Sequence, residues 1–260
     1  MLSKPPAALA RGIYTTSSGN SALGVAWMAR RLGICATAVV PASAARSKLD
    51  KLLKLGARIE TRSDDAWWRA VQIGALADQE GLYIDAVRDP AALAGNGTIA
   101  LEVLAAARDL DAILVPFGGG GLACGIACAV RVLRPQVKVI ACELASAHPL
   151  YSAFEGGHPV DTEHATGFVS GMGVGAVLPA MWPLVSSVID GVLTVSLAEV
   201  AAAIRTLAER SRVIAAGAGA VSVAAALSGR HEYKTVCAVV SGGNLDAHAL
   251  TTILQGGVPS

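Results

Sequence analysis

Two glycine-rich stretches stand out, because each directly follows a short apolar run. Gly118-Gly119-Gly120-Gly121 follows the first run, and Ser241-Gly242-Gly243-Asn244 follows the second. A glycine inside a helix or strand costs about 0.5–1 kcal/mol relative to alanine, so four in succession do not serve as filler there. They suit a loop whose backbone N–H groups crowd around an anion. The tetraglycine therefore predicts a phosphate site.

A third polar stretch, Ser17-Ser18-Gly19-Asn20, lies between an expected strand and an expected helix. Hydroxyl and amide groups at a helix start can bind an anion, or they can simply cap the helix. Both interpretations stay open for this stretch. A plain turn without a ligand stays open for each of the two glycine-rich loops.

A dinucleotide site competes with the phosphate monoester site. Gly118, Gly120 and Ala123 satisfy the permissive G-x-G-x-x-A pattern, and Glu143 ends the next strand, where an acid would bind a ribose. An NAD-dependent dehydrogenase therefore remains an alternative. A dinucleotide needs only one such loop, however, whereas a small phosphorylated ring could use all three.

Composition excludes several other classes. The chain has 260 residues, 53% hydrophobic and 16% charged, with a formal net charge of +1. A nucleic-acid surface would need clustered basic residues, which are absent. No run of 18 apolar residues could span a membrane, and residues 1–12 lack the apolar core of a signal peptide. We therefore expect a cytoplasmic protein.

The cysteines favour free thiols over a metal site. There are five of them, Cys35, Cys124, Cys128, Cys142 and Cys237, mostly isolated in apolar runs. Cys124 and Cys128 share one face of a helix, but no second close Cys or His pair completes the four ligands of a structural zinc site. We expect no metal.

Stretches rich in β-branched residues alternate with longer stretches rich in Ala and Leu. The expected strands are 13–16, 36–40, 58–61, 82–84, 112–115, 137–142 and 236–240. The expected helices are 20–32, 46–55, 64–80, 97–107, 122–133, 197–209 with Ser196 as N-cap, 213–227 and 248–254. This alternation predicts an α/β fold with mostly parallel sheets and ligands at the carboxyl ends of the strands. Residues 151–175 are irregular, and either cover a site or form a surface crossover. No internal repeat is visible.

Five stretches resemble, in family order, the fold-type II pyridoxal-phosphate enzymes of the serine/threonine dehydratase (threonine ammonia-lyase) and serine racemase group. They are Thr16–Asn20, Leu55–Ala57, Ala94–Glu102, Val115–Gly121 and Val240–Asn244. The resemblance implies two three-layer α/β lobes of the tryptophan synthase β type. We expect a small lobe over residues 12–95, a large lobe over 96–260 together with 1–11, and a pocket between them.

The resemblance also implies roles for single residues. Gly118, Gly119, Gly120 and Gly121 would hold the phosphate of pyridoxal 5'-phosphate, with Asn20 at the ring hydroxyl, Ser241 at the pyridine nitrogen and Gly167 near the ring. Ser17, Ser18 and Gly19 would bind the substrate carboxylate, and Ser18 would donate or accept a proton. The implied reaction is dehydration and deamination of a small β-hydroxy amino acid such as threonine or serine, giving a 2-oxo acid and ammonia. A homodimer is common in this family.

Several positions depart from the family pattern. The Schiff-base lysine lies in a Ser-Phe-Lys-type segment far upstream of the serine loop, and Lys4, the only upstream lysine here, has neighbours that do not match it. The usual His after Asn20 is Ser21, and an acid of the family is Ala216. Glu143 matches one metal ligand of some members, but its partner Asp is replaced by Pro149.

Two interpretations of these departures stay open. The chain is either a shortened relative of an ordinary dehydratase, or a non-catalytic protein that binds pyridoxal phosphate or a similar anion. In both cases we expect an incomplete large lobe with exposed apolar edges and poor solubility. The substrate side chain is left open among serine, threonine and bulkier β-hydroxy amino acids.

Overall fold

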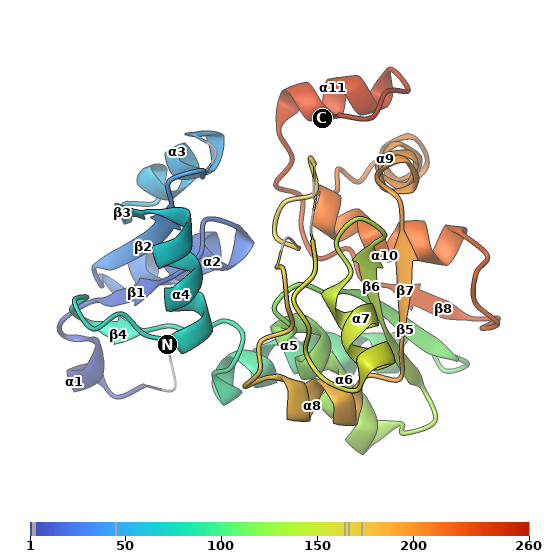
Figure 1. Ribbon diagram of the computed structural model, residues 1–260, viewed down its shortest axis with the longest axis horizontal. Helices are drawn as coiled ribbons and strands as arrows, with labels where there is room; N and C mark the ends of the chain where they lie inside the picture. Colours follow the sequence, from blue (N-terminus) through green and yellow to red (C-terminus); the bar gives the residue numbers. More distant parts are fainter. Residues whose placement is uncertain (2–3, 45, 164, 166, 173, 260) are drawn as a thin grey trace. The chain divides into compact units, whose positions relative to one another are not determined.

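The computed structural model describes residues 1, 4–44, 46–163, 165, 167–172 and 174–259. The chain forms two compact units, Met1–Ala91 and Ala92–Ser260. Each unit contains one four-stranded, wholly parallel sheet with helices packed on it (Figure 1). The α/β class predicted from the alternation of residue types is therefore confirmed.

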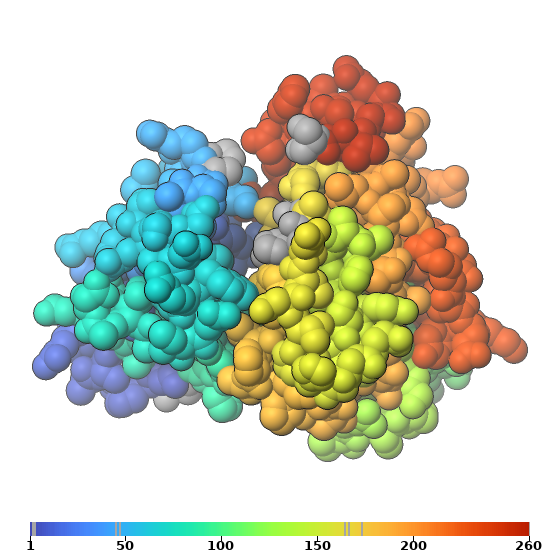
Figure 2. Space-filling model, in the orientation of Figure 1, coloured from blue at the N-terminus to red at the C-terminus, as the bar shows by residue number. Residues whose placement is uncertain are grey.

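The sheet of the first unit has the strand order β3-β2-β1-β4. Its strands are β1 (Ile13–Thr15), β2 (Ala36–Pro41), β3 (Arg58–Arg62) and β4 (Leu82–Tyr83), and its helices are α1 (Pro6–Leu9), α2 (Asn20–Leu32), α3 (Arg46–Lys54) and α4 (Asp64–Ile73). Helix α4 packs on β2; it lies in front of the sheet in Figure 1 and forms the teal middle of this unit's surface in Figure 2.

Helix α2 shows how the sequence specifies this packing. Ala22, Val25, Ala26 and Ala29 recur at helical spacing, and all four are buried against the sheet and α3. The helix ends at Gly33, whose backbone adopts the left-handed conformation (φ +66°) that favours glycine. A run of small residues thus brings α2 close to the strands it connects.

The N-terminal residues belong to the first unit rather than to the larger one, where we had expected residues 1–11. Met1 and Leu9 pack against the cluster around Ile13, and Lys4 forms an ion pair with Asp89 (3.0 Å). The apolar side chains of this segment therefore find their partners beside β1. The division between the units falls after Ala91, slightly before the expected boundary at residue 95.

The sheet of the second unit has the strand order β7-β6-β5-β8. Its strands are β5 (Ala112–Pro116), β6 (Lys138–Leu144), β7 (Gly191–Val195) and β8 (Val236–Ala238). Its helices are α5 (Pro90–Ala106), α6 (Gly121–Leu133), α7 (Pro149–Gly156), α8 (Trp182–Val188), α9 (Leu197–Thr206), α10 (Gly217–Leu227) and α11 (Ala247–Leu254), with a π-helical turn at Leu207–Ser211.

Both faces of this second sheet are buried. On one face, Leu114 and Cys142 join a large cluster with residues of α9 and α10. Ile113, next to Leu114 in β5, is equally buried, and α6 packs on β5 and β6. A parallel sheet covered on both faces explains why β5 is apolar along its whole length.

Several element boundaries differ from those predicted. Helix α4 ends at Ile73 instead of Glu80, and α5 begins at Pro90 instead of Gly97. Helix α10 begins at Gly217, four residues into the stretch expected to be helical. Helices α7 and α8 and strand β7 were not predicted. Ser196 does cap α9, as predicted, in a reciprocal capping box with Glu199.

Candidate active site

The tetraglycine loop has a geometry that requires glycine. It follows β5 and Phe117, whose N–H donates to the Cys142 carbonyl (2.9 Å). Gly120 is the N-cap of α6 and has a φ of +92°, where a side chain would strain the backbone. A β-carbon at Gly118 would lie 2.7 Å from the Gly171 carbonyl oxygen. The turn and its close neighbour thus explain two of the four glycines.

This loop also fits a phosphate group. Within the described part of the chain, no side chain caps the N-terminus of α6. The first N–H groups of a helix have no partner inside the helix, and they carry partial positive charge. Gly118 and Gly119 are only partly buried, so a bulky anion can approach the backbone there, whereas Gly120 and Gly121 are buried. The tetraglycine is therefore suited to holding the phosphate of a cofactor.

Helix α5 packs against the start of α6 and forms a hydrogen bond with the last glycine of the loop. The Asn96 side-chain amide donates to the Gly121 carbonyl (3.2 Å). One turn of α5 also lies very close to α6. A β-carbon at Gly97 would lie 3.0 Å from the Gly125 oxygen, and a β-carbon at Gly125 would lie 2.4 Å from the Leu93 oxygen. The stretch Ala94–Glu102, noted above only for its resemblance, thus has a packing role beside the loop.

The Ser241-Gly242-Gly243-Asn244 loop leaves the same edge of the same sheet. Strand β8 pairs in parallel with β5, so the two loops leave adjacent carboxyl ends. The Gly242 carbonyl accepts the N–H of Ala216 (2.8 Å), and a β-carbon at Gly219 would lie 2.6 Å from that same carbonyl oxygen. The start of α10 therefore holds this loop closely, while Ser241 itself is exposed.

The segment 167–172 connects these features. A β-carbon at Gly217, the first residue of α10, would lie 2.9 Å from the Val169 Cα, and the Gly171 carbonyl approaches Gly118. Gly167 has a φ of +48° and packs close to Leu197. The second unit thus brings together the segment carrying Gly167, the tetraglycine and the start of α10, which in turn holds the Ser241 loop. Residues 164, 166 and 173 lie outside the described residues.

The serine loop lies in the first unit, at the carboxyl end of β1. Gly19 is the N-cap of α2, and no side chain in the described part of the chain caps this helix. The Ser17 hydroxyl accepts the N–H of Gly19 (3.2 Å), and Asn20, the first residue of α2, is exposed. The polar side chains therefore do not serve as helix caps. This leaves the helix end accessible to an anion such as a carboxylate.

Glu143 does not have the role that a dinucleotide site would need. Its side chain is 1% exposed and accepts the N–H groups of Leu150 (3.0 Å) and Tyr151 (2.9 Å) in the first turn of α7. Burial raises the pKa of Glu143 to about 7, although both N–H groups favour the charged form. A carboxylate enclosed in this way cannot bind a ribose, so the predicted ribose contact is wrong.

The lysines of the second unit lie away from the glycine loops. Lys138 begins β6 and pairs with Asp190 (3.2 Å), and Lys234 precedes β8 with its N–H donated to Asp111 (2.9 Å). Both residues therefore lie toward the amino ends of parallel strands, at the edge opposite the tetraglycine. Neither lysine is therefore placed to act beside the tetraglycine loop.

The described residues offer no metal centre. They contain no group of three or more His, Cys, Asp or Glu side chains that could hold a metal ion. All five cysteines are free, and burial raises the pKa of Cys124 to about 12. No helix in the described part of the chain is long and apolar enough to cross a membrane.

Two parallel α/β units, one of which has a glycine loop at an uncapped helix N-terminus, are typical of a class of proteins that bind phosphorylated cofactors. Comparison with known families identifies the cofactor. Residues 2–242 match the family described as "Pyridoxal-phosphate dependent enzyme". The chain belongs to this family, whose members depend on pyridoxal phosphate.

Individual relatives agree with this assignment. The chain is 37% identical to an L-threonine ammonia-lyase of Geobacter sulfurreducens over 99% of its own length and 65% of that relative's length. Threonine deaminase isoform 2 of Solanum lycopersicum superposes with a TM-score of 0.86 at 28% identity, covering 98% of this chain and 76% of that one. Serine racemase of Dictyostelium discoideum gives 0.81 at 27% identity, covering 93% and 79%. The resemblance to the serine/threonine dehydratase group is thereby confirmed.

Proposed function

We propose that this chain binds pyridoxal 5'-phosphate and acts on a small β-hydroxy amino acid such as threonine or serine, releasing a 2-oxo acid and ammonia. The observation that carries the proposal is the tetraglycine loop at the uncapped N-terminus of α6. The relatives named as threonine ammonia-lyase and threonine deaminase support the choice of substrate.

Each residue of the proposed site has its own role in binding the cofactor or the substrate. Gly118 to Gly121 would hold the phosphate by their N–H groups, Asn20 would contact the ring hydroxyl, and Gly167 would lie near the ring. When bound, the cofactor supplies a pyridine ring that takes up the electrons of the substrate's Cα–H bond. Ser17, Ser18 and Gly19 bind the substrate carboxylate at the start of α2, and the Ser18 hydroxyl donates or accepts the proton at Cα.

Ser241 sets the electronic character of the ring. A hydroxyl beside the pyridine nitrogen is neutral, so it does not hold a proton on that nitrogen as a carboxylate would. Beside Ser241, a bound ring would be a weaker electron acceptor, which would favour prompt loss of the β-hydroxyl over transamination. The exposure of Ser241 and the close support of its loop by Gly219 are consistent with this contact.

A second candidate is a non-catalytic protein that retains pyridoxal phosphate. It is favoured by one observation, the location of Lys138 and Lys234 toward the amino ends of their strands, away from the glycine loops. The chemistry of this family needs an amine that anchors the cofactor covalently and moves protons. If no lysine of the first unit reaches the cofactor either, the chain would bind it without turning over an amino acid.

Retention of the cofactor tests whether the tetraglycine loop binds its phosphate. The purified chain is incubated with pyridoxal phosphate, passed through a gel-filtration column and assayed for bound cofactor by absorbance. Gly118→Ala places a β-carbon 2.7 Å from the Gly171 oxygen, so we expect at least tenfold weaker retention. Gly95→Ala is the matched control, since a β-carbon there meets nothing within 4 Å.

The same samples separate the two candidates. Release of ammonia and a 2-oxo acid from threonine or serine supports the lyase. Retention of the cofactor without product supports the non-catalytic protein. A wild-type chain that retains no pyridoxal phosphate contradicts both.

A further inference from the structure

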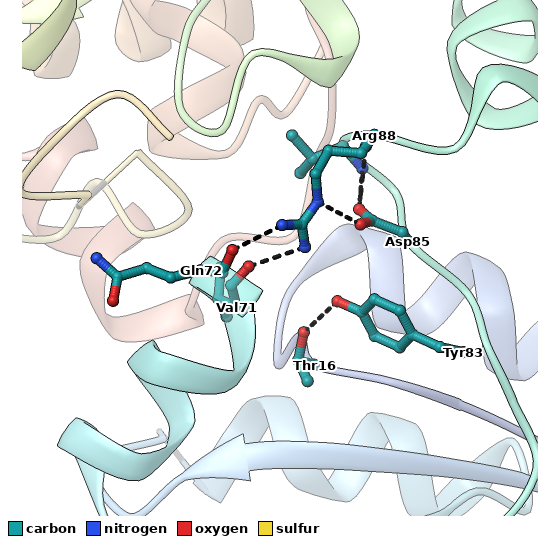
Figure 3. Close-up of polar contacts among 7 residues, drawn as sticks. Thr16, Val71, Gln72, Tyr83, Asp85 and Arg88 are labelled. Atoms are coloured by element: carbon teal, nitrogen blue, oxygen red, sulfur yellow. Dashed lines mark hydrogen bonds and ion pairs between the residues drawn. The ribbon is translucent and has the colours of Figure 1, made fainter. Parts of the chain in front are cut away.

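The serine loop is tethered by a side chain that lies far away in the sequence. Thr16, the residue directly before Ser17, is buried, and its Oγ1 lies 2.7 Å from the Tyr83 hydroxyl on β4 (Figure 3). Either hydroxyl can donate this hydrogen bond. Since β4 pairs with β1 in parallel, Tyr83 reaches Thr16 across adjacent strands where β1 leads into the loop.

Tyr83 is itself held in place by aromatic packing. Its ring packs on that of Tyr14, with centroids 5.1 Å apart and planes tilted by 36°. Burial raises the pKa of Tyr83, so its phenol stays protonated at neutral pH and remains able to donate. The Tyr14 hydroxyl serves a different contact, because it accepts the N–H of Leu76 (3.1 Å).

The backbone that follows Tyr83 is clamped as well. The Arg88 Nε donates to Asp85 (2.6 Å), and the same carboxylate accepts the N–H groups of Val87 and Arg88. The Arg88 guanidinium also donates to the carbonyls of Val71 (2.9 Å) and Gln72 (2.8 Å) at the end of α4, as Figure 3 shows. These bonds fix the end of β4 to a helix and limit the movement of Tyr83.

A glycine makes room for this clamp. Gly74, which ends α4 with a φ of +79°, has no β-carbon, and one placed there would lie 2.3 Å from the Arg88 guanidinium. Arg88 thereby reaches the last carbonyls of α4, which have no partner within the helix. Three features therefore hold the backbone after Tyr83: the left-handed Gly74, the carbonyl groups at the end of α4, and the ion pair between Arg88 and Asp85.

We propose that Tyr83 is a positioning residue for the serine loop. Its hydroxyl holds Thr16, and Thr16 sets where the N–H and hydroxyl groups of Ser17 to Asn20 lie. The inference rests on the proposed function, in which this loop binds the substrate carboxylate. Loss of the Tyr83 hydroxyl should then loosen the loop and weaken amino-acid binding, while the cofactor phosphate is still retained by the tetraglycine.

Tyr83→Phe removes this hydroxyl and preserves the ring. A net hydrogen bond is worth about 0.5–1.5 kcal/mol, which corresponds to roughly two- to twelvefold in an equilibrium constant. We expect amide hydrogen exchange in residues 16–20 to rise by that factor. We expect the dissociation constant of L-threonine or L-serine for the cofactor-loaded chain to rise by the same factor, with a smaller change in cofactor retention, because the tetraglycine still holds the phosphate and only Asn20 of this loop contacts the ring.

Tyr14→Phe is the matched control, since it makes the same change in the same aromatic pair but breaks the bond to Leu76. It should leave exchange in residues 16–20 and amino-acid affinity at wild-type values. Thr16→Val should reproduce Tyr83→Phe, the double variant should be no worse than either single one, and Thr16→Ser should retain wild-type behaviour.

The outcomes separate this inference from the proposed function. Unchanged loop exchange and affinity in Tyr83→Phe, or equal changes in Tyr14→Phe, overturn the positioning role. If loop exchange rises in Tyr83→Phe but no variant, nor the wild type, binds an amino acid, the role of the loop in substrate binding is overturned, whereas the hold of Tyr83 on Thr16 is supported.

Discussion

Glu143 shows how one residue can be held between opposing electrostatic effects. Its carboxylate lies in the interior, where burial disfavours the charge, but it accepts two backbone N–H groups at the start of α7. These N–H groups are unsatisfied within the helix, and a carboxylate is their natural partner. Burial is the stronger effect, so the pKa rises from 4.5 to about 7.

This shift makes folding stability depend on pH. Because the folded-state pKa lies above the ordinary value of 4.5, the folded chain binds more protons than the unfolded chain between about pH 4.5 and pH 7. The contribution of Glu143 therefore falls as pH rises through this window, by on the order of 3 kcal/mol, and is constant above it.

Glu143→Gln removes the titration. Urea unfolding at pH 5, 6 and 8 should show a pH-dependent loss of stability in the wild type that is smaller in the variant. The variant should also be more stable than the wild type at pH 8, because the amide, like the protonated carboxyl group, carries no charge into the interior. Equal pH dependence in the two proteins would contradict the shift.

Single residues differ in how well the sequence reveals them. The glycines of 118–121 were evident because a run of four glycines suits neither a helix nor a strand. The bond between Thr16 and Tyr83 joins side chains 67 residues apart and leaves no local pattern. Arg88 likewise has its partners Val71 and Gln72 on another element. Loop chemistry was therefore predictable, but the residues that support the loops were not.

At the scale of elements, the close contact of α5 with α6 supports the phosphate loop. Gly125 meets the Leu93 carbonyl and Asn96, and Gly97 meets the Gly125 carbonyl. Small residues at a crossing let two helices approach with their backbones nearly touching. Asn96 then lies near enough to bond the Gly121 carbonyl. The helix pair thus fixes the start of α6, where the anion would bind.

Two glycine substitutions test this contact. Gly125→Ala places a β-carbon 2.4 Å from the Leu93 oxygen and should destabilise the chain by about 1–3 kcal/mol. Gly24→Ala, in the middle of α2, meets nothing within 4 Å and should stabilise it by about 0.5–1 kcal/mol, since alanine is the better helix former. Urea unfolding measures both, and equal effects would contradict the proposed close crossing.

The boundaries of elements were predicted where local signals and packing agree. Helix α2 was predicted residue for residue, because its apolar spacing and Gly33 indicate the same ends. Helix α4 stops early because the left-handed Gly74 and the Arg88 guanidinium end it, although Ala and Leu continue the pattern. Pro90 suits the first position of α5, which the glycines further along obscured. Strand β7 was missed although it is as long as β5 and its run of Val, Leu and Thr is typical of a strand.

At the scale of the molecule, the two units repeat one topology. Each sheet has its third strand at one edge, followed by the second and the first, with the fourth beside the first. No internal repeat is visible in the sequence. Strand order is set by connections and packing rather than by particular residues, so the repeat survives without sequence similarity. Apart from Gly167, the candidate residues follow the carboxyl ends of strands. They follow β1 in the first unit, and the adjacent strands β5 and β8 in the second.

Binding of a ligand to the folded state stabilises the fold, so the proposed cofactor site can be tested by measuring unfolding. A ligand that binds only the folded state stabilises it by about 2.7 kcal/mol at a concentration one hundred times its dissociation constant. Pyridoxal phosphate should therefore raise the urea midpoint of the second unit, Ala92–Ser260, and protect residues 117–124 and 241–244 from hydrogen exchange.

Pyridoxal without its phosphate should have a much weaker effect, because the tetraglycine loop would have no anion to bind. Gly118→Ala should lose most of the protection, whereas Gly95→Ala should keep it. An unchanged midpoint at saturating pyridoxal phosphate would contradict cofactor binding. Equal stabilisation by pyridoxal would instead show that the ring, and not the phosphate loop, supplies the affinity.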